Sequence, residues 1–296
     1  MSGKLSRRSF IASGSGTLLA GALGVRPRAA AAGEETTSSR AVLVRRREVL
    51  DDEGGVVGPV LEEMLDEAVV ALLEVGDAPA AWKTLIGADD VVGIKSNVWS
   101  HLPTPPSLED AIRSEVLTVG VNPENISVDD RGVRTNPVFQ RATAIINTRP
   151  MRTHHWAGLG TSLKNLIMFV PRPADYHGDA CASLGAVWRL PEVDGKVRLN
   201  VLVMLTPQFH GVGPHSYSPR YVWPYGGLIV GTDPVAVDAT GARIIQAKRD
   251  LFFGEPRPIA PPPHHIAIAG ERYGLGVSDP DRIDLVRLGW MDEALI

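Results

Sequence analysis

The sequence has a single cysteine, Cys181, among its 296 residues. One thiol cannot form an intrachain disulfide, and an iron–sulfur cluster held by cysteines needs about four thiolates. We therefore expect neither of them, and we expect the fold to tolerate the loss of Cys181. The sequence identifies no cofactor, and a metal ion is one option that stays open.

Several common catalytic signatures are also missing. The chain contains no G-x-S-x-G elbow, no Walker loop and no H-E-x-x-H pair. The standard serine hydrolase, nucleoside triphosphatase and zinc protease classes therefore have no support. Long apolar runs are missing too. Residues 9–24 are diluted by glycine and serine, and this stretch is too short and too weakly apolar to span a bilayer.

The first 33 residues contain no acidic side chain, but they contain five basic ones. A positive start ("SRRSFIA"), a mildly apolar stretch and a run of small residues ("RAAAAG") follow one another in the order of an export signal. Arg7, Arg8 and Phe10 resemble the twin-arginine motif, with Ala12 where that motif has lysine. The sequence therefore predicts that residues 1–32 are a twin-arginine export signal.

Removal of residues 1–32 would leave a protein of residues 33–296 in the periplasm or outside the cell. Its formal net charge would move from −4 to −9, because the signal carries only basic charges. An acidic body argues against nucleic acid or an anionic membrane as the main partner. The expected partners are the twin-arginine translocase during export and a small-molecule ligand, with no stable membrane span after cleavage.

Short apolar segments alternate with amphipathic ones along the rest of the chain. This alternation predicts one α/β domain, with a largely parallel sheet covered by helices. A proline-rich stretch, residues 253–265, is expected on the surface, with His264 and His265 exposed. The predicted strands are 41–50, 89–97, 126–130, 142–148, 197–205 and 225–232, and the predicted helices are 58–76, 107–120 and 233–247.

Polar side chains follow several of these strands where the strands end. Ligands of such sheets collect at the carboxyl ends of the strands. Four of the five candidates also have a structural interpretation: Lys95 as a solvated edge charge, Asp129 and Asp130 as turn residues, and Asp233 as a helix N-cap, which we favour for Asp233. The candidates are Lys95, Asn97, Asp129, Asp130 and Asp233.

The segment "MRTHHWAGLGTSLKN", residues 151–165, combines two histidines with a lysine. Its small residues leave room for backbone N–H groups to approach a ligand. A lysine in such a pocket can lose its proton and act as a base or nucleophile, and imidazoles can relay protons or bind metal. Alternatively, His154 and His155 hydrogen-bond to backbone in a wet loop, and Lys164 extends its head to solvent.

A second histidine pair, His210 and His215, flanks a glycine–proline turn in "HGVGPH". Two imidazoles on one loop could share a metal ion. We treat this as the minority interpretation.

The order of the motifs resembles the domain-of-unknown-function family 362. The matching stretches are "VVGIKSN", "VDD", "IINTRPMRTHHWAGLGTSLKN", "GVGP" and "LIVGTDPVAVDA", which run from about Lys95 to Asp238. The resemblance adds Asn165 and Asp238 to the substrate- or cofactor-binding candidates. This chain lacks the acidic residue that many relatives have before the G-P turn, and it lacks their cysteine-rich ferredoxin segment. The activity of that family is not established, so the resemblance implies a fold more than a reaction.

A more distant resemblance concerns the nickel-pincer lactate racemases. Those enzymes have a histidine, a glycine-rich stretch, a lysine that bears the pincer and a further histidine. Here His154 precedes Lys164 by ten positions and His177 follows. This resemblance covers some 25 residues and implies His154 and His177 as metal ligands.

These patterns leave two functional hypotheses. The first is an exported enzyme that uses Lys164 and His154, with His177 or Asp233 assisting, on a small anionic substrate. Proton abstraction next to a carbonyl or a cofactor-assisted redox step would suit these groups. The second is a binding protein that holds a metal ion or small molecule without turnover. We expect Lys95, Asp129 and the 154–164 segment around one cleft, closed by the helix start at Asp233.

Overall fold

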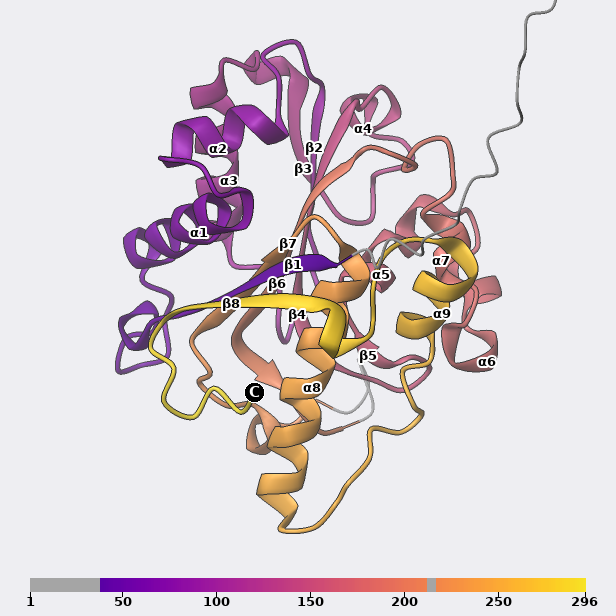
Figure 1. Ribbon diagram of the computed structural model, residues 1–296. Helices are drawn as coiled ribbons and strands as arrows, with labels where there is room; N and C mark the ends of the chain where they lie inside the picture. Colours follow the sequence, from indigo (N-terminus) through magenta and orange to yellow (C-terminus); the bar gives the residue numbers. More distant parts are fainter. Residues whose placement is uncertain (1–37, 212–216) are drawn as a thin grey trace, which may run out of the picture. The chain divides into compact units, whose positions relative to one another are not determined.

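The computed structural model describes residues 38–211 and 217–296. The expected export signal and His215 lie outside the described residues. The described chain is an α/β domain around one eight-stranded sheet, as expected (Figure 1). The strands are β1 Ser39–Arg45, β2 Val92–Lys95, β3 Ile126–Asp129, β4 Ala144–His154, β5 Gly158–Gly160, β6 Val197–Gln208, β7 Gly227–Gly231 and β8 Ile283–Gly289.

The sheet is mostly parallel, as its predicted class requires. Its order is β3-β2-β4-β6-β7-β1-β8, and β5 pairs only with β4. Strand β7 is antiparallel to both of its neighbours. The other strands of this order run in one direction, because β2, β3, β4 and β6 pair in parallel and β1 pairs in parallel with β8. The carboxyl ends of β2, β3 and β4 therefore lie at one edge.

Two layers of helices cover the two faces of this sheet (Figure 1). Alternate residues of one strand point to opposite faces, so Val42 and Val44 pack in one core while Ala41 and Leu43 pack in the other. The first core is covered by α1 Gly58–Leu73, α2 Ala78–Leu85 and α3 Pro106–Val119. The second is covered by α5 Ser162–Asn165, α7 Leu184–Val187, α8 Pro234–Phe253 and α9 His265–Tyr273. The other short helices are α4 Pro137–Gln140 and α6 Gly178–Cys181.

The helix ends follow local chemistry. Helix α3 ends at Gly120, whose φ of 107° suits a residue without a Cβ atom. Helix α8 begins after Asp233, which caps it, and extends six residues beyond the predicted end at residue 247. Helix α1 ends at Leu73 with Glu74 in the left-handed region, so Gly76 is not its cap.

Two parts of the chain differ from the expectation in ways that matter for the site. Strand β4 was expected to end at residue 148, but it continues to His154, and all eleven of its residues are buried. The proline-rich stretch is only partly a surface segment, because Ile259 and His265 are buried while His264 is exposed. In both places, polar side chains that sequence patterns assign to loops lie in the interior.

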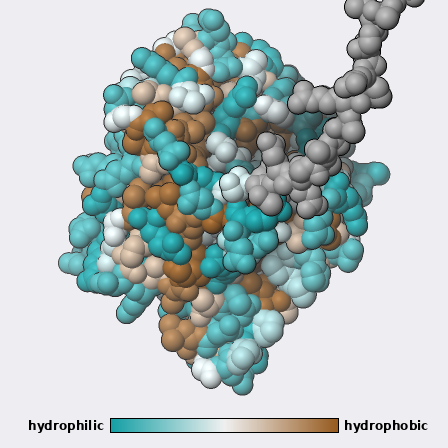
Figure 2. All heavy atoms as spheres, viewed as in Figure 1, coloured by the Kyte–Doolittle hydropathy of each residue, from teal (hydrophilic) through white to brown (hydrophobic). Residues whose placement is uncertain are grey.

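The surface carries scattered apolar side chains. Figure 2 shows apolar areas between hydrophilic ones on one face of the molecule, and Leu251 and Phe252 near the C-terminal end of α8 are exposed. Isolated apolar side chains of this kind are normal on a protein surface. In residues 38–211 and 217–296, no helix has the length and apolar character needed to cross a membrane.

Candidate functional site

Lys95 lies at the end of β2, directly beside Asp129 on β3 and Asn147 on β4. It is fully buried, so it is not a solvated edge charge. Its ammonium group donates to the carboxylate of Asp130 and, at 2.7 Å, to the carbonyl of Ser96. Burial lowers the pKa of Lys95 to about 8, against the opposing attraction of Asp130. Lys95 is therefore a buried, paired lysine.

The two adjacent aspartates have different roles. Asp129 accepts from Gly132 N at 2.8 Å and from Asn136 Nδ2 at 3.0 Å, so it opens the turn after β3. Asp130 accepts from Lys95 and from Val98 N. Burial alone would raise the pKa of Asp130, but the charge and hydrogen bond of Lys95 outweigh it and hold that pKa below its usual value. The partner of Lys95 is thus Asp130 and not Asp129, the candidate that we had singled out for binding.

Asn165, the last residue of α5, ties the strand ends together. Its amide group is directed at Asn147 Oδ1 at 2.8 Å, and at the carbonyls of Thr148 at 3.0 Å and Ser96 at 3.2 Å. Its own oxygen accepts from Asn97 Nδ2 at 3.3 Å. Asn97 and Asn165 are both buried. Asn165, the asparagine of the K-N pair, thus fixes α5 against β2 and β4.

Asp238, on α8, holds the other end of α5. Its carboxylate accepts from Ser162 N at 2.9 Å, from Leu163 N at 2.8 Å and from the hydroxyl of Thr161. Burial raises the pKa of Asp238 to about 6, although these hydrogen bonds favour the charged form. Asp238 therefore positions the short helix that carries Lys164.

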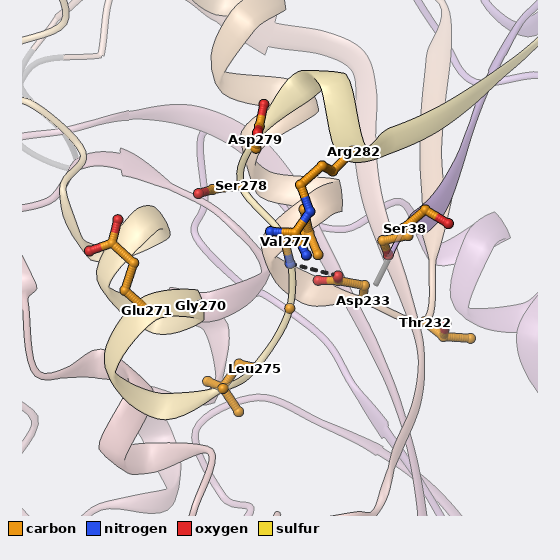
Figure 3. A pocket seen from close by; sticks show the side chains of 13 residues that line it. Ser38, Thr232, Asp233, Gly270, Glu271, Leu275, Val277, Ser278, Asp279 and Arg282 are labelled. Atoms are coloured by element: carbon orange, nitrogen blue, oxygen red, sulfur yellow. Dashed lines mark hydrogen bonds between the residues drawn. The ribbon is translucent and has the colours of Figure 1, made fainter. Parts of the chain in front are cut away.

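Asp233 has a separate, structural role. Its carboxylate accepts from Val235 N, Ala236 N and Val277 N, as an N-cap does (Figure 3). It borders a surface hollow of about 720 Å³, whose lining includes neither His154 nor Lys164. Figure 3 shows Asp233 beneath Val277, while Glu271 points away from it. Asp233 is therefore the helix N-cap that its structural interpretation expected, and the hollow that it borders is not lined by Lys164.

Lys164 is 2% exposed, which excludes a head that reaches bulk solvent. Its Nζ lies 3.9 Å from Cys181 Sγ. Burial lowers the pKa of Lys164 to about 8; the Cys181 thiol opposes this shift, and the charges of Arg149 and Arg152 reinforce it. Near neutral pH this lysine can both take up and release a proton.

His154 is also buried, at 6% exposure. Its Nδ1 accepts from Trp156 N at 3.2 Å, so the neutral ring carries its proton on Nε2. Burial holds the pKa of His154 far below its usual value, helped by the charges of Lys164, Arg149 and Arg152. His154 is therefore a neutral group that can donate a hydrogen bond, and it is not a wet-loop histidine.

Four rings gather where this region meets solvent. His154 stacks on His155 with ring centroids 4.9 Å apart, and Trp156 stacks on His177 at 4.0 Å. Trp156 is exposed, whereas His155 and His177 are half-buried. Burial lowers the pKa of His177 to about 4, assisted by Lys164 and His155. The positive charge of Lys164 thus disfavours protonation of both His154 and His177.

One segment of the chain is similar to a known protein family. Residues 113–243 match the model of the domain of unknown function DUF362. This segment contains Asp129, His154, Lys164, Asn165 and Asp238, but not Lys95 or Asn97. No curated protein and no solved structure matches the chain. The similarity to lactate racemases stays a prediction.

The described residues of this segment form no metal centre. His154 and His177 have ring centroids 6.3 Å apart. In the part of the chain that the structure describes, no group of three or more His, Cys, Asp or Glu side chains is placed to hold a metal ion. The ring of His210 is hydrogen-bonded with Arg249 at 2.9 Å, and its predicted partner His215 lies outside the described residues.

Three basic residues near Lys164 were missed by the sequence analysis. Arg149 and Arg152 lie on β4 at 4% exposure each, and His265 at the start of α9 is fully buried. Their charges affect Lys164 or are affected by it. The sequence "NTRPMR" contains a signal for these arginines, because both of them directly follow the apolar residues of a predicted strand. A strand that continues through two arginines contradicts ordinary burial preferences, so they were assigned to a loop.

Proposed function

We propose that this protein is an enzyme that removes a proton next to the carbonyl of a small anionic substrate, with Lys164 as the base. The observation that carries the proposal is a buried lysine without a carboxylate. Lys95 is just as buried and is paired with Asp130. Among the described residues, no carboxylate forms an ion pair with Lys164, whose pKa is nevertheless about 8. A base of this strength is suited to proton transfer near neutral pH.

The neighbouring groups fit the charge that such a reaction develops. Removal of a proton next to a carbonyl places negative charge on the carbonyl oxygen. Arg149 and Arg152 supply positive charge to the same region, and His154 offers a neutral N–H donor. Fixed donors in a buried site stabilise such an oxyanion strongly, because they need no reorganisation. A cofactor-assisted redox step at the same carbon is a second reaction that these groups would suit.

A binding protein without turnover is the alternative function. The deep burial of Lys164, His154 and both arginines favours a ligand that is enclosed once bound. Lys164→Arg separates the two functions. Arginine keeps the charge but does not act as a base, so it would abolish catalysis while a binder would largely tolerate it.

The test is exchange of substrate protons with solvent. The full chain would be incubated in D2O with short 2-hydroxy and 2-oxo acids that carry one or two carboxylates, and loss of the proton signal next to the carbonyl would be followed by NMR. We expect exchange with at least one acid, and a loss of about 10²–10⁴-fold in Lys164→Arg. Lys83→Arg, at an exposed position on α2, is the control and should keep the wild-type rate.

Two outcomes would overturn the proposal. One is the absence of exchange with every acid in the panel, and the other is exchange that survives Lys164→Arg. Retained ligand binding without any exchange would select the binding protein.

We also propose that the protein works after export by the twin-arginine route. The support is the sequence pattern around Arg7 and Arg8 and the acid-free segment that contains it. In this proposal the translocase is the partner during export, and the mature protein, residues 33–296, meets its substrate in the periplasm or outside the cell.

A further inference from the structure

Four arginines of the described residues are almost completely buried, and two of them show how this protein satisfies such a group. Arg45 donates to the carbonyls of Tyr225 at 2.9 Å and Asp292 at 2.8 Å. Arg249 donates to the carbonyls of Phe209 at 2.9 Å, Arg257 at 2.7 Å and Pro258 at 2.9 Å. In both cases backbone oxygens take up the guanidinium protons, as burial of a charged group requires.

Arg149 and Arg152 are equally buried, but no backbone carbonyl of the described residues accepts from them. Among the described residues, Arg149 Nε, Arg152 Nε and Arg152 Nη1 are buried without a hydrogen-bond partner. Arg152 lies over the ring of Trp99 at 4.1 Å, a contact that satisfies no N–H group. Leaving buried charged donors unpaired is costly. Unpaired donors are thus present at Arg149 and Arg152, whereas Arg45 and Arg249 donate to backbone carbonyls.

The two unpaired guanidinium groups converge on one place. A Cβ atom added at Gly160 would lie 2.7 Å from Arg149 Nη2 and 2.9 Å from Arg152 Nη1. In a regular strand, residues three apart point to opposite faces. The register of β4 against β6 shifts between Pro150 and Arg152, which lets both side chains reach the same side. The convergence is thus built into the strand.

The surroundings add positive charge and donors without adding a free carboxylate. Lys164 has no carboxylate partner among the described residues, and both ring nitrogens of His265 are buried without a partner. The two nearby carboxylates are occupied, Asp130 by Lys95 and Asp238 by the start of α5. Arg149, Arg152 and Lys164 therefore form a buried group of three cations that has no ion-pair partner among the described residues, although Asp130 attracts both arginines and Asp238 attracts Arg149. We call this group the cation cluster.

We propose that the cation cluster binds a compact, doubly charged anion, with one oxyanion group held between Arg149 and Arg152. The proposal rests on the proposed function for what happens to that anion, and it names its charge class: a short dicarboxylate, or a phosphate or sulfate group. The guanidinium groups hold the oxyanion by charge-assisted hydrogen bonds, and Lys164 faces the rest of the ligand. His265 supplies a further N–H donor from α9.

The charge class of the ligand follows from the number of cations in the cation cluster. A monocarboxylate would neutralise one of three buried cations, whereas a dianion neutralises two and leaves only Lys164 without a neutralising partner. Two guanidinium groups that converge on one place also fit a single oxyanion better than two separate ones. A planar carboxylate and a tetrahedral phosphate share this chemistry, so the experiment includes both.

The test measures binding, so it does not depend on turnover. The full chain would be titrated calorimetrically, at constant ionic strength, with malonate, oxalate, phosphate and sulfate, and with acetate as the singly charged control. We expect at least one dianion to bind about tenfold or more tightly than acetate. Binding of malonate or oxalate alone would identify a dicarboxylate site, and binding of phosphate or sulfate alone a tetrahedral one.

Four variants connect that binding to the cation cluster. Arg149→Met and Arg152→Met should weaken the dianion by about tenfold or more, and neither should lower the melting temperature of the free protein, because each removes an uncompensated charge. Arg152→Lys keeps a charge without the fork and should also weaken binding. Arg249→Met is the matched control: it should lower the melting temperature, because it removes satisfied hydrogen bonds, and leave dianion affinity unchanged.

The inference would be overturned if no dianion bound more tightly than acetate, or if affinity were the same in Arg149→Met and Arg152→Met as in the wild type. The proposed function fails separately. Dianion binding without proton exchange would leave this inference standing and refute the base role of Lys164. Proton exchange on a monocarboxylate without dianion binding would support the base role of Lys164 and refute the dianion site.

Discussion

At the scale of single residues, the contrast between Lys95 and Lys164 carries the account. Both ammonium groups are buried and both have a pKa of about 8. Lys95 donates to Asp130 and a backbone carbonyl, so its proton is held in a structural pair. Lys164 has only the Cys181 thiol within reach in the described structure. An unpaired buried lysine destabilises the folded protein, and enzymes tolerate this destabilisation where the reaction needs a base.

A first prediction concerns pH. Lys164 acts as a base only when it is neutral, and its pKa in the free protein is about 8 because burial disfavours the charged form. The kcat/KM for proton exchange should therefore rise with pH up to about 8 and level off above it. Cys181, Arg149 and Arg152 act on the charge of Lys164, and His154, His177 and His265 lie close enough to feel it. A rate that falls as pH rises through 8 would contradict the base role.

A second prediction concerns Gly160. Alanine there would place a methyl group against Arg149 Nη2 and Arg152 Nη1, so both guanidinium groups would have to move. We expect Gly160→Ala to weaken dianion binding by about tenfold, measured by calorimetry. Gly76→Ala is a suitable control, because nothing lies within 4 Å of the added carbon. Equal affinity in both variants would show that the oxyanion does not lie between these arginines.

Sequence alone located part of this residue-level picture. Lys164, His154, Asn165 and Asp238 were recognisable from motif order, and Lys95 from its place at a strand end. The difference between Asp129 and Asp130 depends on the turn after β3, which the letters "VDD" do not specify. His265 follows three prolines and was expected to be exposed, yet it is fully buried. Such burial depends on tertiary packing and has no local signature.

At the scale of elements, α5 is the part on which the site depends most. It has only four residues, Ser162–Asn165, so its own hydrogen bonds cannot hold it in place. Asp238 binds its start, and Asn165 binds its end to β2 and β4. Lys164 is therefore positioned by side chains from other elements.

A third prediction follows for Asp238. Asp238→Asn keeps the shape of the side chain but removes the charge that three donors contact, and its NH2 group cannot accept from them. We expect a loss of about 1–3 kcal/mol in the free energy of unfolding, measured by urea denaturation. We also expect proton exchange to fall by more than the loss of folded protein explains. Full exchange activity in the folded variant would show that α5 does not need this anchor.

The same scale shows where pattern-based prediction works and where it fails. Apolar periodicity placed α3 to within one residue, because helix boundaries marked by proline and glycine are local signals. Strand β4 was cut short at residue 148, because Arg149 and Arg152 look like loop residues. The register shift that brings both arginines to one side depends on pairing with β6, which is a long-range property. The sequence therefore predicted only some of the residues that form the candidate site.

At the scale of the whole molecule, the sheet brings the ends of β2, β3 and β4 to one edge, as its predicted class implied. Strand β8 was not expected, and neither was the reversed direction of β7. Strand direction depends on how connections cross the sheet, so alternation along the chain does not determine it for every strand.

A fourth prediction belongs to this scale and concerns export. The mature protein should begin between Ala30 and Gly33, as measured by intact mass on the exported fraction. Replacing Arg7 and Arg8 together by lysine should leave the protein in the cytoplasm. Replacing Lys4 by arginine, outside the twin-arginine pair, is the control and should not affect export. An uncleaved chain that begins at Met1 outside the cytoplasm would contradict this prediction.

The most direct test of the central claim is an NMR titration of the lysine side chains, with carbon-13 at Cε, in the full chain with and without malonate. Lys164, identified by the signal that Lys164→Met removes, should titrate near pH 8 in the free protein. If malonate binds beside it, the added negative charge should raise that pKa, while the paired Lys95 should respond less. A Lys164 that titrates near 10.5 and ignores malonate would contradict the account, because it would be neither an available base nor part of an anion site.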